Sequence, residues 1–227
     1  MLTTLALTTL ATLATPSALA SDLTSSLWHP GAGGMEKGFS YAGTAVMAAA
    51  GPGYAGTWIG ATAAWAPTKR LSVSGTGLVA VGSTVVAGGV RFNIIESKWF
   101  RAGPVAFGAA WDHTENEASR AVGGGLGLAV ESGFTRVRFD TFVPLVVATG
   151  GEGPLVLADR LPGFDYWNVG MTVRMGGSHA NRLRGSISSG GVSFAYQHVG
   201  EHWFMETALT AGVTPTVSGS LRGGFVF

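Results

Sequence analysis

The segment from His198 to His202 is the first place where residue types and spacing could do chemistry. His198, Glu201 and His202 match the HxxEH pattern, in which two histidines bind one zinc ion and the glutamate works as a base. Both histidines must then lie on one helix face, but Gly200 divides the motif and its flanks alternate as strands do. We therefore predict a polar turn between two strands and no metal site.

Residues 51–56 (GPGYAG) match the glycine pattern GxGxxG. A dinucleotide site would need a helix after the glycines and an acidic residue about 20 positions further on. There is no Asp or Glu between Glu36 and Glu96, and the residues that follow the glycines are strand-like. We predict a hairpin turn here and no cofactor.

The elements that position these residues must be inferred from composition, beginning at the amino-terminal end. Residues 1–20 carry no charged side chain and close on Ala18-Leu19-Ala20, which predicts a cleavable secretory signal peptide. Residues 21–34 have no periodicity and are expected to form an unstructured leader, so that the folded domain spans residues 35–227. The chain has no cysteine, which excludes disulfides.

The overall composition is unusual for a water-soluble domain. The chain has 36 glycines, 46% apolar residues and 12% charged residues, whereas an average chain has about 25% charged residues. A net charge of +1 without a basic run argues against a nucleic-acid partner. After residue 20 no run of 18 apolar residues occurs, so a transmembrane helix is not expected. An exported, apolar chain without membrane helices favours a closed β-barrel, in which neighbouring strands satisfy every backbone group.

Alternation with a period of two supports this all-β fold class. Apolar residues alternate with polar or small ones along residues 134–145 and 166–175, and the same holds around Val90, Val105, Phe107, Val130 and Leu209. With apolar residues facing outward, the pattern predicts a closed antiparallel transmembrane barrel of about 12 strands, with ten or eight as alternatives. The longer polar segments 112–120 and 150–165 are expected to be outward loops. A soluble secreted β-sandwich is the alternative fold.

The signal peptide, the missing cysteines and the alternating strands resemble those of bacterial outer-membrane β-barrel proteins. In that family the last strand carries aromatic residues at alternate positions and ends in Phe, and the barrel-insertion machinery recognises it. Here one face of the last strand contains Val217, Leu221, Phe225 and Phe227. The resemblance implies a Gram-negative outer membrane, reached after export to the periplasm, with membrane lipid and the insertion machinery as partners.

Charged residues within the strands are expected to face the lumen, because Arg or Lys facing lipid would cost about 2–4 kcal/mol at the membrane midplane. The predicted lumen-lining residues are Arg91, Glu131, Arg136, Arg138, Asp140, Arg174, Arg184, Glu206 and Arg222. Six cations against three anions favour a cationic passage for small solutes that weakly prefers anions. The alternative is a set of arginine–carboxylate bridges that closes the barrel.

Three functions remain open at this point. The first is a small, non-enzymatic, porin-like pore, and the second is a structural barrel whose loops meet partners outside the cell. The third is a hydrolase at the rim of the barrel, for which Asp112-His113 and two nearby glutamates are the closest candidates. Nucleophilic catalysis needs a serine within hydrogen-bond reach of an oriented base, but no serine adjoins His198 and Ser119 lies in a predicted loop. We therefore expect no catalytic residues.

Overall fold

The computed structural model describes residues 40–51, 54–68, 70–97, 99–113, 116–132, 137–150, 154, 156–157, 168–175, 181–188, 191–212 and 217–227. The predicted signal peptide, the predicted leader, Arg136 and most of segment 150–165 lie outside these residues. Within the described part of the chain, no helix is long and apolar enough to cross a membrane.

Fourteen strands make up the described fold. In chain order they are β1 (Tyr41–Gly51), β2 (Tyr54–Trp65), β3 (Leu71–Ala80), β4 (Ser83–Phe92), β5 (Ile95–Glu96), β6 (Phe100–His113), β7 (Asn116–Ser132), β8 (Val137–Gly150), β9 (Val156–Leu157), β10 (Asn168–Met175), β11 (Asn181–Ser188), β12 (Gly191–Val199), β13 (Trp203–Gly212) and β14 (Val217–Val226).

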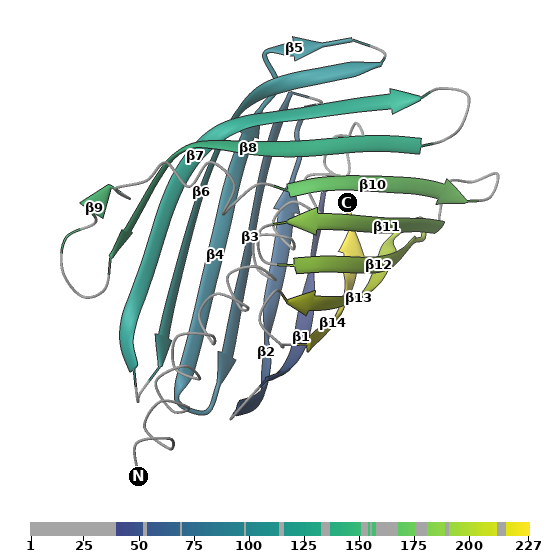
Figure 1. Cartoon of the computed structure of the whole chain (residues 1–227). Helices are drawn as coiled ribbons and strands as arrows, with labels where there is room; N and C mark the ends of the chain where they lie inside the picture. Colours follow the sequence, from purple (N-terminus) through teal and green to yellow (C-terminus); the bar gives the residue numbers. More distant parts are fainter. Residues whose placement is uncertain are drawn as a thin grey trace.

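Twelve of these strands form one closed antiparallel ring (Figure 1). Each ring strand pairs with the next along the chain, β10 pairs with β8, and β14 pairs with β1 to close the ring. The two short strands lie outside the ring, β5 against β6 and β9 against β8. The predicted barrel of 12 strands is confirmed, and the alternatives of ten or eight strands and of a β-sandwich are wrong.

The ring closes where the first and last strands meet, as the terminal aromatic residues predict. Tyr41 lies opposite Val226, and the backbone N–H of Phe227 donates to the carbonyl of Ser40 at 2.9 Å. The two backbones approach closely beside this point, because a Cβ added at Gly43 would lie 2.2 Å from the carbonyl oxygen of Gly223. Glycine at position 43 is therefore a packing requirement of the closure.

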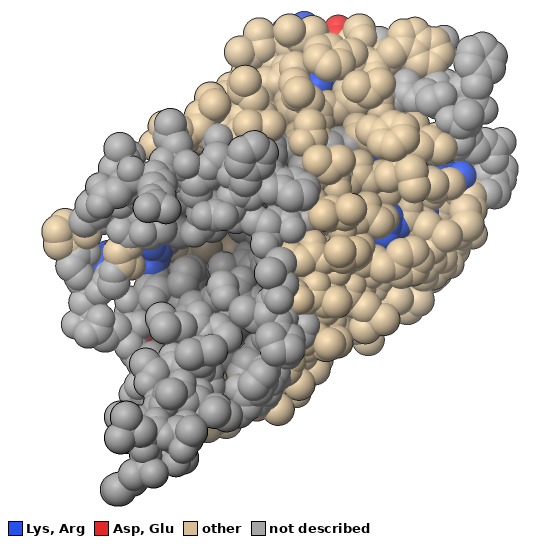
Figure 2. All heavy atoms as spheres, viewed as in Figure 1, with Lys and Arg blue, Asp and Glu red and all other residues tan. Residues whose placement is uncertain are grey.

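Alternation places apolar side chains on the outer surface of the ring. On β14, Val217, Leu221 and Phe225 are exposed, while Ser218 and Arg222 between them are buried. The same two-residue period separates exposed Val90 and Phe92 from buried Arg91 on β4. Figure 2 shows the result on one face, where few charged atoms interrupt the described surface. Such a surface suits a hydrocarbon environment.

The orientation predicted for β6 is wrong. Val105 and Phe107 are buried inside the ring, whereas Pro104 and Ala106 face outward. The neighbouring strand β7 explains the inversion, because a Cβ at Gly123 would lie 2.6 Å from Cζ of Phe107 and one at Gly127 would lie 2.8 Å from a methyl carbon of Val105. Glycines on β7 thus make room for large side chains inside the barrel.

The segment 112–120 was expected to be a loop, and most of it is strand. β6 continues to His113, β7 begins at Asn116, and Trp111 lies opposite Ser119. With 14 to 17 residues, β6, β7 and β8 are the long strands of the ring, whereas β10 and β11 have 8 residues each (Figure 1). Outside the hydrocarbon layer a strand needs no apolar face, so the polar sequence of this hairpin gave no strand signal.

Candidate functional site: the polar interior of the barrel

Charged side chains gather on the inner face of the ring. Arg91, Arg138, Arg184, Glu206 and Arg222 are buried there, and Arg174 is half-buried. Glu131 and Asp140 occupy inward positions of β7 and β8 by the alternation of their strands, but their side chains lie outside the described residues, as does Arg136 entirely. The role of these residues in lining a passage remains a prediction.

One row of directly paired residues crosses five strands of the inner face. Its members, from β10 to β14, are Arg174, Arg182, Gln197, Glu206 and Arg222. An Nη1–H of Arg182 donates to Oε1 of Gln197 at 3.3 Å, and the Gln197 amide donates to Oε2 of Glu206 at 3.1 Å. Arg222 Nη1 lies 3.8 Å from Oε1 of Glu206, and both side chains are more than nine-tenths buried. The row therefore places the Glu206 carboxylate between the Gln197 amide and the Arg222 guanidinium group, and Gln197 links it to Arg182.

Tyr41 of β1 connects this row to β2 across the closure of the ring, although it is paired in register with Val226 and not with Arg222. Its side chain makes hydrogen bonds with Arg222 and with Thr62 of β2, and its ring centroid lies 4.4 Å from that of Phe204. Thr62 in turn shares a 3.0 Å hydrogen bond with Thr76 of β3. Tyr41 thus connects β13 and β14 to β2 on the inner face.

A second polar row contains hydroxyl groups. Ser186, Ser193, Thr210 and Ser218 are buried and lie directly opposite one another on β11, β12, β13 and β14. The Ser186 and Ser193 hydroxyls form a hydrogen bond. Together, the inward residues of β8 and of β10 to β14 form what we call the polar sector.

Buried arginines also occur within the polar sector, on the side of β8. Thr172 of β10 lies between Arg138 of β8 and Arg184 of β11, and all three side chains are buried. With Arg174 and Arg182, four arginines of β8, β10 and β11 thus share one region of the inner wall. A further arginine lies on β4, where Nε of Arg91 donates to Oδ1 of Asn93 at 2.9 Å.

The inner face of β1 to β4 has a different character, and we call it the apolar sector. It contains a packed cluster of buried residues, Ala45, Met47, Ala49, Trp58, Leu78, Val85 and Ala87. Val85 has no exposed surface. The indole N–H of Trp58 donates to the Ser83 hydroxyl at 3.2 Å, so its polar atom is satisfied. This part of the interior is filled by side chains.

Sequence reasoning missed three residues of the interior networks, namely Tyr41, Arg182 and Gln197. Arg182 shares the even positions of β11 with Arg184, so the alternation could have found it. Gln197 carries no charge, and its inward position follows only from its alternation with exposed Phe194 and Val192 in β12. Tyr41 gave no signal, because an aromatic residue near a strand end is also typical of the lipid-facing surface.

The other candidate motifs have the structures predicted for them. His198 lies in β12 and His202 lies in the turn before β13, so the HxxEH segment is a polar turn. Gly51 pairs with Tyr54 across the hairpin between β1 and β2. Among the described residues no group of three or more His, Cys, Asp and Glu could hold a metal ion. Asp112 is exposed, and the side chains of His113 and Ser119 lie outside the described residues.

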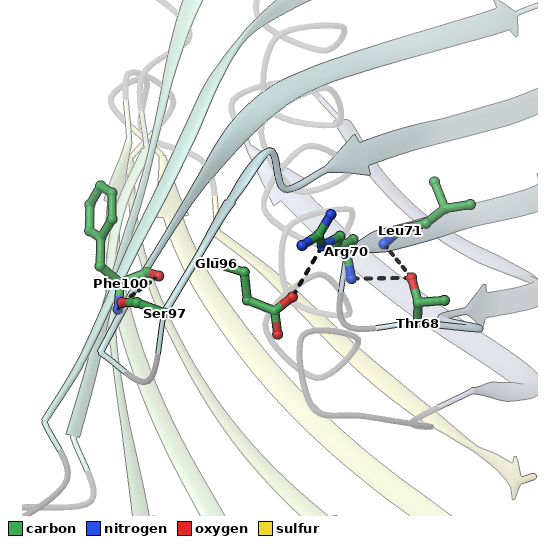
Figure 3. Close-up of polar contacts among 6 residues, drawn as sticks. All are labelled: Thr68, Arg70, Leu71, Glu96, Ser97 and Phe100. Carbon is green, nitrogen blue, oxygen red and sulfur yellow. Dashed lines mark hydrogen bonds and ion pairs between the residues drawn. The ribbon is translucent and has the colours of Figure 1, made fainter.

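The connections at the end of the barrel that carries the C-terminus are tied together by polar contacts (Figure 3). The Thr68 hydroxyl accepts from the backbone N–H groups of Arg70 and Leu71, and the Ser97 hydroxyl contacts Phe100 in the β5–β6 turn. Nε of Arg70 lies 3.5 Å from Oε2 of Glu96. Because the Arg70 side chain is largely exposed, we expect this ion pair to contribute little.

Comparison with known proteins gives a match in fold but not in sequence. No protein-family model and no curated protein matches the chain. Among solved structures, the KdgM porin in complex with disordered oligogalacturonate superposes with a TM-score of 0.55 at 6% identity, covering 83% of this chain and 99% of that one. A second KdgM porin structure gives 0.52 at 6% identity, with 82% and 99% covered. The translocator domain of the autotransporter NalP from Neisseria meningitidis gives 0.42 at 11% identity, with 96% and 98% covered.

The likeness to the two KdgM porin structures and the strand pairing of the ring define the class of the fold. The chain is a closed β-barrel of the kind found in bacterial outer-membrane proteins. Its fold is similar to that of the KdgM porin, although identities near 6% extend that similarity to the fold alone.

Proposed function

We propose that the chain is a non-enzymatic pore of the bacterial outer membrane, whose aqueous path follows the polar sector and favours anions. The observation that carries the proposal is the excess of arginine on the inner face. Four arginines are buried in the polar sector, Arg138, Arg182, Arg184 and Arg222, and a fifth, Arg91, is buried on β4. Glu206 is the buried acid among the described side chains. Glu131 and Asp140 can add two carboxylates at inward positions, which still leaves the interior cationic.

An unequal set of charges is costly in a sealed interior. Transfer of an ion from water to a dry protein interior costs several kcal/mol, and a partner charge offsets this cost only in good geometry. Water in the polar sector would hydrate the guanidinium groups and lower that cost. The hydroxyl row from Ser186 to Ser218 gives the same path a wettable wall.

The side chains that fill the apolar sector limit the expected width of the aqueous path. Barrels of about eight strands are filled by their side chains, and barrels of 16 or more leave a channel. Here Met47, Trp58, Leu78 and Val85 fill one side of a ring of 12 strands. A narrow path beside them is therefore expected, in a fold similar to one that a porin also adopts.

Planar-bilayer recording with a salt gradient tests this proposal. The purified barrel should give small unitary conductance steps and a reversal potential that indicates preference for chloride over potassium. Replacement of Arg182 and Arg184 by Gln should shift the reversal potential toward zero. The matched control is Arg70→Gln, because Arg70 lies outside the ring in a turn, and it should leave selectivity unchanged.

Absence of conductance at every voltage would overturn the pore. It would favour the alternative of a structural barrel, in which arginine–carboxylate contacts close the interior and the outward segments near residues 112–120 and 150–165 meet partners.

A further inference from the structure

Four side chains form a connected group on the outer face of the barrel, and we call them the rim cluster. They are Asn181, Tyr196, His198 and Trp203, at the adjoining ends of β11, β12 and β13. They alternate along their strands with the buried residues Arg182, Gln197 and Phe204. Trp203 pairs with Phe225, and the N–H of Val226 donates to the carbonyl of His202, so the cluster lies at the end of the barrel that carries the C-terminus.

Hydrogen bonds fix the histidine ring within the rim cluster. Oδ1 of Asn181 accepts from the Tyr196 hydroxyl at 2.8 Å and lies 2.6 Å from Nδ1 of His198. Because this oxygen can only accept, Nδ1 of His198 carries the proton and donates. The imidazole is thereby held in one orientation.

The fixed imidazole positions the indole of Trp203. The two rings stack with centroids 4.8 Å apart and planes 29° apart. The turn preceding β13 is shaped to receive the indole, because a Cβ at Gly200 would lie 2.5 Å from Nε1 of Trp203. Even so, 48% of the tryptophan surface stays exposed. An indole held in place with open surface can offer a π-face to a ligand.

An acidic residue lies beside the rim cluster, next to the exposed His202. Glu201 is exposed in the turn between His198 and Trp203. Among the described outward residues of β10 to β14 and this turn there is no Lys or Arg. A carboxylate beside an exposed indole, without a neighbouring fixed cation, favours a cationic ligand.

We propose that the rim cluster and Glu201 bind the ammonium group of a zwitterionic phospholipid headgroup. The outer face of a membrane barrel at this level meets the interface between headgroups and hydrocarbon, where Trp and Tyr gather. The Trp203 indole contacts the ammonium through its π-face, and the Glu201 carboxylate accepts its hydrogen bonds. A primary ammonium, as in an ethanolamine headgroup, satisfies both contacts, whereas an anionic glycerol headgroup meets the carboxylate with the wrong charge. The site requires the barrel to stand in a membrane but not to conduct.

Native mass spectrometry of the purified barrel with mixed lipids tests the assignment. Equimolar phosphatidylethanolamine and phosphatidylglycerol should be retained in a ratio of about three to one, as one cation–π contact of about 0.7 kcal/mol provides. The variant Trp203→Leu, which removes the cation–π contact, should bring the ratio close to one, and Glu201→Gln, which removes the charge beside the indole, should lower it. The matched control is Trp65→Leu, which removes another exposed tryptophan, from β2, and should keep the wild-type ratio.

Three results would overturn the proposal. They are equal retention of the two lipids by the wild type, an equal loss in the Trp65 and Trp203 variants, and retention of the preference in Glu201→Gln together with Trp203→Leu. A further arm with free ethanolamine distinguishes the source of the ammonium group. Displacement of lipid by millimolar ethanolamine would assign the site to a free amine, whereas persistence of the lipid preference supports the headgroup.

Discussion

The polar and apolar sectors differ in content although they share one backbone geometry. The row of paired residues that contains Arg182, Glu206 and Arg222 continues from β14 into β1 to β4 as Ala45, Gly60, Leu78 and Val85. In both sectors the residues of this row are paired in direct register and point into the barrel. The difference teaches that one part of the interior works as a hydrophobic core, while another part keeps charges and hydroxyls together beside it.

Substitution of Trp58 should give the largest loss of stability. Trp58→Ala opens a cavity in the apolar sector and leaves the Ser83 hydroxyl without its donor. We expect the free energy of unfolding to fall by about 3–5 kcal/mol, measured by urea unfolding in lipid vesicles. The control Trp65→Ala removes an exposed tryptophan and should cost clearly less. Equal losses would contradict a packed apolar sector.

The boundary between the two sectors is sensitive to added volume. Gly43→Ala places a methyl group against the backbone of β14 and should cost about 1–3 kcal/mol. Gly185→Ala in β11 is the matched control, because nothing lies within 4 Å of its added Cβ. Heat-modifiable migration on gels reports the folded fraction, which should fall for Gly43→Ala alone. A normal folded fraction for that variant would show that the two strands separate easily.

The Glu206 carboxylate should contribute less to the free energy of unfolding. Glu206→Gln keeps the shape of the side chain but removes the charge opposite Arg222, and should cost about 1–2 kcal/mol. In the proposed pore it should also raise the chloride preference in reversal-potential measurements. The control is Glu201→Gln, because Glu201 is exposed in a turn. This variant should change the free energy of unfolding by less than about 0.5 kcal/mol. A Glu206 variant as stable as this control would place Arg222 on other partners.

Substitutions in the hydroxyl row should cost the least stability of any in the interior. Ser193→Ala removes one hydrogen bond with Ser186 and should cost under about 1 kcal/mol, because water can replace the hydroxyl in a wet sector. The reciprocal change Ala87→Ser adds a hydroxyl to the apolar sector and should cost more, about 1–3 kcal/mol. Urea unfolding of the two variants side by side gives the comparison, and the reverse order would contradict the assignment of the sectors.

The sequence predicts the outer surface better than the inner one. Strand number, closure and the outward positions of Leu221 and Phe225 were predicted from a period of two, because an outer surface that faces lipid would accept only apolar side chains at those positions. The inner face has no such uniform solvent. In β1 and β2, where Ala and Gly occupy both faces, hydrophobicity could not distinguish the core-facing Trp58 from the lipid-facing Trp65.

Where the predicted orientation of β6 failed, the cause lay on a neighbouring strand. Phe107 faces inward because glycines of β7 leave space for it, and no pattern within β6 contains that information. The sequence predicted the polar networks as inward charges, with arginine–carboxylate bridges as an alternative, but not which residues contact one another. The neighbours of Gln197 are set by the register between β11, β12 and β13, which depends on the whole ring.

Cysteine accessibility tests the division of the interior most directly, because the chain has no cysteine of its own. A single cysteine at Thr210 in the polar sector, or at Ala87 in the apolar sector, can be treated with a small anionic thiol reagent in intact membranes. We predict that Thr210→Cys reacts at least about tenfold faster than Ala87→Cys, since the proposed aqueous path passes Thr210 whereas packed side chains cover Ala87. Equal rates at the two positions, or no reaction at Thr210→Cys, would contradict a hydrated polar sector beside a filled apolar one.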